Sequence, residues 1–187
     1  MSKIIGFTII ETLITLAILS SLIFIGIPHF NSFMVDTRVD SEISILHRLL
    51  LIARNSALTH NSNVTLCPLN SQGHCTHLWH NEVSVFTDTN NNKVYEPTLG
   101  EIIIAVKDAI KNGDKLQYGK TRIGLTYAAT GHLAGWGQNA TFSYCPKDHI
   151  GKSRGIIVAT SGRSYVSSAN KKHTANVKRS GGKIVWK

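Results

Sequence analysis

A single apolar run near the N-terminus limits what this chain can fold into. Between residues 7 and 27 the only charged residue is Glu11, and no proline interrupts the run. At a rise of ~1.5 Å per residue, about 20 helical residues match the ~30 Å hydrocarbon core of a bilayer. The run therefore predicts a transmembrane helix over residues 7–27, preceded by a short leader, residues 1–6.

A glycine stands before this apolar run rather than behind it. A secretory signal peptide has its small-residue cleavage site after the apolar region, so Gly6 argues against that class. The segment Gly6–Glu11, with the sequence GFTIIE, resembles the processing site of type IV prepilins and type II secretion pseudopilins. The resemblance implies cleavage between Gly6 and Phe7 by an inner-membrane prepilin peptidase, followed by N-methylation of Phe7.

Glu11 is an ionisable residue inside the predicted membrane span. Such residues are costly in lipid and are functional-site hypotheses by default. In the prepilin interpretation, Glu11 pairs with the freed α-amino group of Phe7 on a neighbouring subunit and fixes the assembly register. The alternative is that Glu11 lies at the membrane interface and reaches water.

Apolar residues continue at helical spacing beyond this run and predict one long helix over residues 7–59. Its second half has one apolar face, which is typical of a helix packed on a domain. The residues of this apolar stripe are Val35, Val39, Ile43, Leu46, Leu50, Ala53 and Ala57.

Residues 60–166 change to short apolar or alternating runs separated by turn-rich clusters, a pattern that predicts an antiparallel sheet or sandwich. We therefore expect an α+β protein, with the long N-terminal helix packed on a β-rich globular head and a basic C-terminal tail, residues 167–187. The predicted strands are 63–67, 83–87, 101–106, 122–127, 140–145, 155–160 and 163–166.

Several segments in this order resemble the FimT/FimU/GspH group of minor pilins. The resemblance favours the FimT-like branch of type IV pili, because Cys67-Pro68 is followed by the later Cys145. It implies a pilin fold, other major and minor pilins as partners, and neither a cofactor nor a catalytic role. The matching segments are LIARNSA at 51–57, VTLCP at 64–68, VFTD at 85–88, TFSYC at 141–145 and GR at 162–163.

The same resemblance implies a location. A protein of this group is a single-pass protein of the inner membrane with a periplasmic head, and it becomes extracellular when it is assembled in a pilus. A GspH-like minor pseudopilin of type II secretion and a purely structural minor pilin are the two alternatives to a FimT-like protein.

The formal net charge of +9 arises entirely from the C-terminal part of the chain. Residues 1–148 contain eleven Lys/Arg and eleven Asp/Glu, whereas residues 149–187 contain nine Lys/Arg and no acid. Cations without acids are typical of a polyanion-binding surface, and FimT-like pilins are associated with binding double-stranded DNA for uptake. The candidate DNA contacts are Arg154, Arg163, Lys171, Lys172, Lys178, Arg179 and Lys183.

One motif departs from the FimT-like branch. Proteins of that branch have the motif Gly-Arg-x-Arg. The corresponding residues of this chain are Gly162-Arg163-Ser164-Tyr165, so the second arginine is missing. The alternative to DNA binding is a solvated basic end, or one that contacts anionic lipid or acidic subunits.

Three cysteines fit a head in an oxidising periplasm, with one disulfide and one thiol left over. We expect the pair Cys67–Cys75, with Cys67–Cys145 as the alternative. Zinc is disfavoured, because the spacing of these cysteines and the nearby histidines matches no standard finger.

Oxygen-bearing residues alternate at Asp88, Asn90 and Asn92, as in calcium loops. Lys93 and Leu99 occupy the positions where an EF-hand has glycine and glutamate, so a β-turn is favoured and calcium remains the alternative. The chain has no motif of a hydrolase elbow, phosphate loop or zinc protease, and we expect no enzyme.

Overall fold

The computed structural model describes residues 8–135 and 137–167, without the side chains of residues 25, 26, 28, 29 and 140. Contacts within the chain define two units, one ending at Thr37 and one beginning at Arg38. We call the described part of the second unit, residues 38–167, the head. The elements are α1 (Ile9–His60), β1 (Val64–Cys67), β2 (Val83–Thr87), η1 (Pro97–Leu99), β3 (Ile103–Lys107), β4 (Lys115–Tyr118), β5 (Leu125–Tyr127), β6 (Ala140–Cys145), η2 (Ile150–Lys152), β7 (Arg154–Val158) and β8 (Ser164–Val166).

Both ends of α1 carry recognisable caps. At the start, Thr8 and Glu11 form a capping box, in which the Thr8 amide donates to Glu11 Oε2 (3.0 Å) and the Glu11 amide donates to Thr8 Oγ1 (3.3 Å). At the end, Asn61 is left-handed (φ 48°) and the Ser62 amide donates to the Ala57 carbonyl (3.3 Å). This is the 6→1 bond of a Schellman motif, so local sequence sets where the helix stops.

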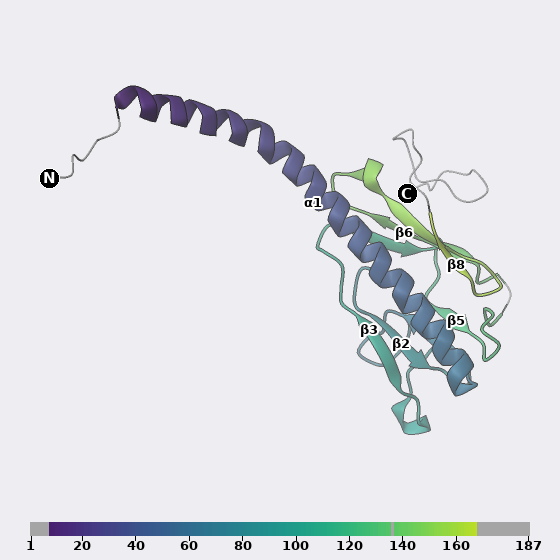
Figure 1. Ribbon diagram of the computed structural model, residues 1–187. Helices are drawn as coiled ribbons and strands as arrows, with labels where there is room; N and C mark the ends of the chain where they lie inside the picture. Colours follow the sequence, from purple (N-terminus) through teal and green to yellow (C-terminus); the bar gives the residue numbers. More distant parts are fainter. Residues whose placement is uncertain (1–7, 136, 168–187) are drawn as a thin grey trace. The chain divides into compact units, whose positions relative to one another are not determined.

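The strands form two four-stranded antiparallel sheets. Their orders are β3-β2-β1-β5 and β4-β6-β7-β8. Figure 1 shows α1 running past strands of both sheets, and three ion pairs of its residues, described below, join it to the head. The α+β class and the helix packed on an antiparallel β-rich head are therefore confirmed.

The apolar stripe of α1 is buried from the point where the head begins. Val39, Ile43, Leu46, Leu50, Ala53 and Ala57 are each at most 3% exposed. Deeper in the head, Trp79 makes edge contacts with Tyr118 and Phe142, which stack on each other at 4.2 Å. Burial of such large side chains is the main favourable contribution to folding.

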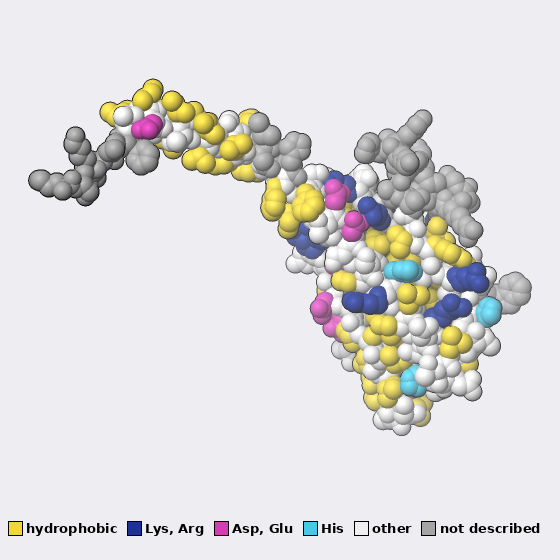
Figure 2. Space-filling model, in the orientation of Figure 1, with side chains coloured by type: hydrophobic (Ala, Val, Ile, Leu, Met, Phe, Trp, Pro, Cys, Tyr) yellow, Lys and Arg dark blue, Asp and Glu magenta, His cyan; other side chains and the backbone are white. Residues whose placement is uncertain are grey.

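Apolar side chains of the first unit, by contrast, are exposed. The large apolar side chains that the structure describes between Ile9 and Met34 are at least 51% exposed, and Figure 2 shows apolar side chains covering much of this segment. The predicted leader and Phe7 lie outside the described residues. Within the part of the chain that the structure describes, no helix reaches the combined length and apolar character needed to cross a membrane.

The strand predictions differ from the structure mainly in the middle of the head. Residues 83–87 and 140–145 were predicted with the observed bounds, whereas β4 was not predicted. The strand expected to start at residue 122 begins at Leu125, because a turn occupies residues 119–121 and the Arg122 carbonyl accepts a hydrogen bond from the Trp79 indole instead of a neighbouring strand.

Candidate functional site

At the N-terminal end, the Glu11 carboxylate is already engaged within its own chain. Glu11 Oε2 accepts hydrogen bonds from both the amide and the hydroxyl (3.1 Å) of Thr8. These contacts hold the carboxylate at the positive end of the helix dipole. Sequence reasoning assigned Glu11 to a neighbouring subunit and missed Thr8, although the Thr-x-x-Glu spacing is a capping signal. The assembly role of Glu11 stays a prediction.

Three ion pairs connect one stretch of α1 to three parts of the head. The partners lie before β4, at the end of β3 and at the start of β7, so this part of the helix is joined to both sheets. The nitrogen–oxygen distances are 3.0 Å for Arg38–Asp114, 2.7 Å for Glu42–Lys107 and 2.5 Å for Asp40–Arg154.

Asp114 is the most buried carboxylate of these pairs, with 1% of its side chain exposed. Besides Arg38, it accepts hydrogen bonds from the Lys147 amide (2.8 Å) and from the Tyr144 hydroxyl. Burial, and then the hydrogen bond to Asp114, raise the pKa of Tyr144 well above its usual value. The phenol therefore stays protonated and donates to the carboxylate across the physiological pH range.

The turn before β8 places Arg163 at the surface. Gly162 has φ 75°, and a Cβ at this position would lie 2.0 Å from the carbonyl oxygen of Gly131. The same carbonyl accepts a hydrogen bond from Arg54 Nε (2.9 Å). The glycine of the Gly-Arg pair is thus required by a close backbone approach, and Arg163 beside it is exposed.

The structure does not bring the two described candidate DNA contacts together. Arg154 begins β7, whereas Arg163 lies past its other end, where the Arg163 carbonyl accepts from the Ala159 amide. At ~3.3 Å per residue, the five residues from Arg154 to Ala159 span about 16 Å. Arg154 is also paired with Asp40. The remaining candidates lie outside the described residues: Lys171, Lys172, Lys178, Arg179 and Lys183.

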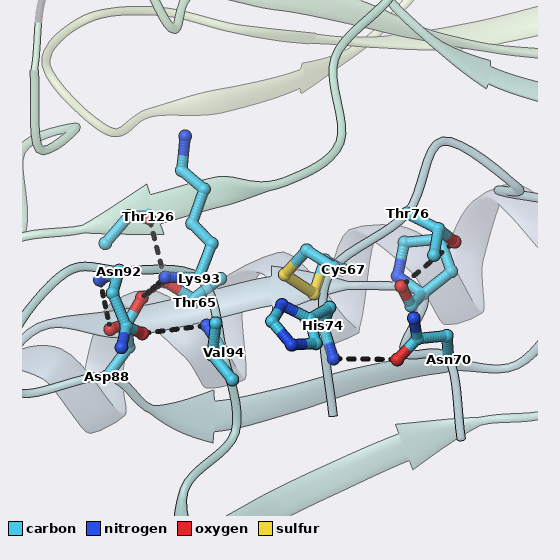
Figure 3. Close-up of a disulfide and its surroundings, with 12 residues drawn as sticks. Thr65, Cys67, Asn70, His74, Thr76, Asp88, Asn92, Lys93, Val94 and Thr126 are labelled. Atoms are coloured by element: carbon cyan, nitrogen blue, oxygen red, sulfur yellow. Dashed lines mark hydrogen bonds between the residues drawn. A yellow bond between two sulfur atoms is a disulfide. The ribbon is translucent and has the colours of Figure 1, made fainter. Parts of the chain in front are cut away.

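Cys67 and Cys75 form a disulfide, with their Cα atoms 5.5 Å apart, and Cys145 is a buried free thiol. The bond closes a loop in which the Asn70 side chain accepts from the His74 amide (2.9 Å), as Figure 3 shows. The pairing is the one favoured from the sequence over Cys67–Cys145.

The Asp88–Asn92 segment is held by hydrogen bonds to the Asp88 carboxylate. Asp88 is buried, and its carboxylate accepts from the amides of Asn92 (3.0 Å) and Lys93 (3.1 Å) and from the Thr65 hydroxyl (2.6 Å), as drawn in Figure 3. These bonds are those of a turn stabilised by an Asx side chain. Among the described residues, no group of three or more His, Cys, Asp or Glu is placed to hold a metal ion.

Comparison with known families assigns the chain. The family model described as "Type II transport protein GspH" matches residues 43–162, which is more than half of the sequence. The chain belongs to the GspH family. The match covers α1 from Ile43 onwards and strands β1 to β7, and it ends at the glycine of the β8 turn.

Two crystal forms of one solved protein share the fold of this chain. A crystal structure of the Pseudomonas aeruginosa type IV minor pilin FimU is similar with a TM-score of 0.55 and 16% identity, covering 73% of this chain and 93% of that one. A second crystal form of FimU is similar with a TM-score of 0.50. The minor pseudopilin EpsH of the Vibrio cholerae type 2 secretion system gives 0.48 at 11% identity, covering 69% and 95% of the respective chains. No curated protein sequence matches the chain.

One feature of this GspH-family head was not anticipated from the sequence. A pocket of about 360 Å³, here called the β4 pocket, is lined by residues from 77–80, 114–118 and 120–122. Lys115, Lys120 and Arg122 lie close together in the sequence, which is the only available signal. Neither β4 nor the position of the 77–80 segment was predicted, so the cluster was not recognised.

Proposed function

We propose that this GspH-family protein is a minor pilin of a type IV pilus that captures double-stranded DNA through its basic C-terminal residues. In this proposal it is anchored in the inner membrane by residues 7–27, with its head in the periplasm. Cleavage after Gly6 and methylation of Phe7 prepare it for assembly with other pilins, after which the head is extracellular.

The exposed apolar surface of the first unit supports the assembly part of the proposal. Its large side chains between Ile9 and Met34 make no core of their own, and an apolar surface of this extent is covered in a stable protein by lipid or by other helices. A pilin provides both: lipid before assembly and neighbouring pilin helices after it.

The charge distribution carries the DNA part of the proposal. All of the excess positive charge comes from residues 149–187, which contain no acid. DNA phosphates are bound by such cations through release of counterions, so the affinity falls steeply with salt. Arg163 is exposed and available to a duplex, whereas Arg154 is already paired with Asp40.

The test measures binding of the detergent-solubilised full chain to labelled duplex DNA across a salt series. Changing Lys171 and Lys172 to Ala removes two predicted phosphate contacts. We expect weaker binding and a decrease of about 1.8 in the slope of log affinity against log salt. The matched control removes two exposed cations elsewhere, Arg48 and Lys111, and should retain the wild-type slope.

Arg163→Ala tests the described contact separately, and weaker binding by this variant would place the duplex near the β8 turn. Absence of binding at low salt, or equal losses in the tail variant and the control, would contradict DNA capture and leave a structural minor pilin.

The family description favours a second candidate, a minor pseudopilin of type II secretion. Deletion of the gene separates the two: a pseudopilin deletion abolishes protein secretion and leaves transformation intact, whereas a DNA-capturing pilin gives the reverse result.

A further inference from the structure

The β4 pocket carries a positive charge that no carboxylate of the described chain neutralises. Lys115, Lys120 and Arg122 line it, and no ion pair joins any of the three to an acid in residues 8–135 and 137–167. Two exposed imidazoles, His77 and His80, add further hydrogen-bonding nitrogens.

Asp114 is the one acidic residue in the lining, and its charge is already used. Its carboxylate is bound by the Arg38 guanidinium, the Lys147 amide and the Tyr144 hydroxyl. With 1% of this side chain exposed, it offers the pocket little negative charge. An anion entering the pocket therefore meets three cations and a carboxylate that is already paired.

The cationic side chains are held on a fixed backbone. The Trp79 indole donates to the Arg122 carbonyl (2.7 Å), and the Arg122 guanidinium lies 5.8 Å from the centre of the Tyr118 ring. The side-chain amide of Gln117 donates to the Lys120 carbonyl (3.4 Å), and the backbone amide of Gly119, at φ 55°, donates to the Thr141 carbonyl (3.1 Å). A turn fixed in this way loses little conformational entropy when it binds a ligand.

We propose that the β4 pocket binds a phosphate group. A phosphate has four oxygens in a tetrahedron, at least two of them unesterified acceptors, and carries one or two negative charges. Its oxygens accept hydrogen bonds from donors of different kinds, and the lining supplies Arg122, two lysines and Thr121. A single carboxylate has two oxygens in one plane and is satisfied by one arginine.

The lining residues belong to 77–122 in the sequence and include none of the candidate DNA contacts, so the inference goes beyond the proposed function. Its ligand chemistry has two sources, a phosphodiester of a DNA backbone or a free phosphate, and the experiment distinguishes them.

The first measurement titrates inorganic phosphate into the detergent-solubilised full chain at constant ionic strength, with chloride as the balancing ion. The indole N–H resonance of Trp79 reports on the site, because this group is bonded to the Arg122 carbonyl. We expect a saturable shift of this resonance. Lys120→Gln/Arg122→Gln should weaken phosphate binding by about tenfold or more, since charge-assisted hydrogen bonds are lost.

Two further variants guard against misfolding and non-specific charge effects. Lys115→Gln/Lys120→Gln alters only exposed side chains of the pocket and should also weaken binding. Arg48→Gln removes an exposed cation outside it and should bind phosphate as the wild type does. A non-saturating shift, or equal binding by all variants, would overturn the proposal. So would a shift produced by polyglutamate and not by phosphate.

Duplex DNA then identifies the source of the phosphate. If the pocket receives the DNA backbone, Lys120→Gln/Arg122→Gln reduces the salt slope of DNA binding by about two while the tail is intact. If phosphate binds and DNA affinity is unchanged, the ligand is a free phosphate. If the wild-type chain binds phosphate but shows no DNA binding that depends on the tail, the proposed function is refuted and the phosphate site is not.

Discussion

At the residue scale, Asp114 connects three parts of the head. It joins Arg38 of α1, Tyr144 of β6 and the backbone at Lys147. Arg38 has 24% of its side chain exposed, against 1% for Asp114. Removing one partner of a buried pair leaves the other with an uncompensated charge, which costs far more than losing an exposed pair.

We therefore expect Asp114→Asn to lower the free energy of unfolding by about 3 kcal/mol, measured by urea denaturation. Asp40→Asn is the matched control, because it removes the same charge from a pair in which both side chains are at least 33% exposed. Its expected cost is below about 1 kcal/mol. Equal losses in the free energy of unfolding for the two variants would show that burial does not increase the contribution of the Arg38–Asp114 pair to stability.

Glu96 gives a pH-dependent contribution in the Asn-rich loop. Its Oε2 accepts from the side-chain amides of Asn90 (3.0 Å) and Asn92 (2.7 Å), and these bonds lower the pKa of the carboxyl. Because the pKa of Glu96 is lower in the folded state, the ionised carboxylate stabilises the loop at any pH above its ordinary pKa near 4.5. This stabilisation is lost as the pH falls through the lowered pKa.

An NMR titration should therefore show the Asn90 and Asn92 side-chain amides shifting together, with an apparent pKa below that of a free glutamate. Glu96→Gln should abolish the transition. A midpoint at or above the ordinary value would contradict the hydrogen-bond arrangement.

At the element scale, the β8 turn depends on one glycine. Gly162→Ala adds a Cβ at φ 75° and places it against the Gly131 carbonyl. Gly100 has a similar φ of 81° with nothing within 4 Å of the added atom. We expect Gly100→Ala to cost about 1 kcal/mol from backbone strain alone, and Gly162→Ala to cost clearly more in thermal unfolding. Similar costs at both sites would mean that the turn moves away from Gly131 freely.

Elements with strong local patterns were predictable from the sequence. The apolar stripe from Val39 to Ala57 gave the helix, and apolar runs such as residues 83–87 gave β2 with its observed bounds. Strand β4 was not predicted, because it is only four residues long. Its two buried residues, Leu116 and Tyr118, alternate with Lys115 and Gln117. A short edge strand of this kind is defined by its partner β6 rather than by its own pattern.

The sites depended on long-range proximity and were less predictable. The Gly162 requirement arises from Gly131, and the β4 pocket joins residues 77–80 to residues 114–122. Spacing along the chain contains no signal for such approaches. Charge counting located an excess of cations but did not show that Arg154 is paired with Asp40.

At the scale of the whole molecule, the chain divides at Thr37/Arg38 into two units. The buried apolar residues of the head begin at Val39, and the head contains the three ion pairs, the disulfide and both sheets. The part of the first unit that the structure describes adds exposed apolar helix and none of the buried apolar residues.

A chain that begins at Arg38 should therefore fold cooperatively, with a free energy of unfolding within about 0.5 kcal/mol of that of the full chain in detergent, since the buried apolar residues and the ion pairs lie in the head. Urea denaturation followed by tryptophan fluorescence measures both. A loss of several kcal/mol would mean that the first unit stabilises the head.

The position of the three ion pairs has a mechanical consequence. Because α1 is continuous from Ile9 to His60, tension applied to residues before Thr37 enters the head at Arg38, Asp40 and Glu42. A load directed along the helix axis makes the buried side chains from Val39 to Ala57 slide out of their contacts together. A load perpendicular to the helix axis would instead break these contacts one after another. The end of the helix that first receives the force is thus the end that is joined to both sheets.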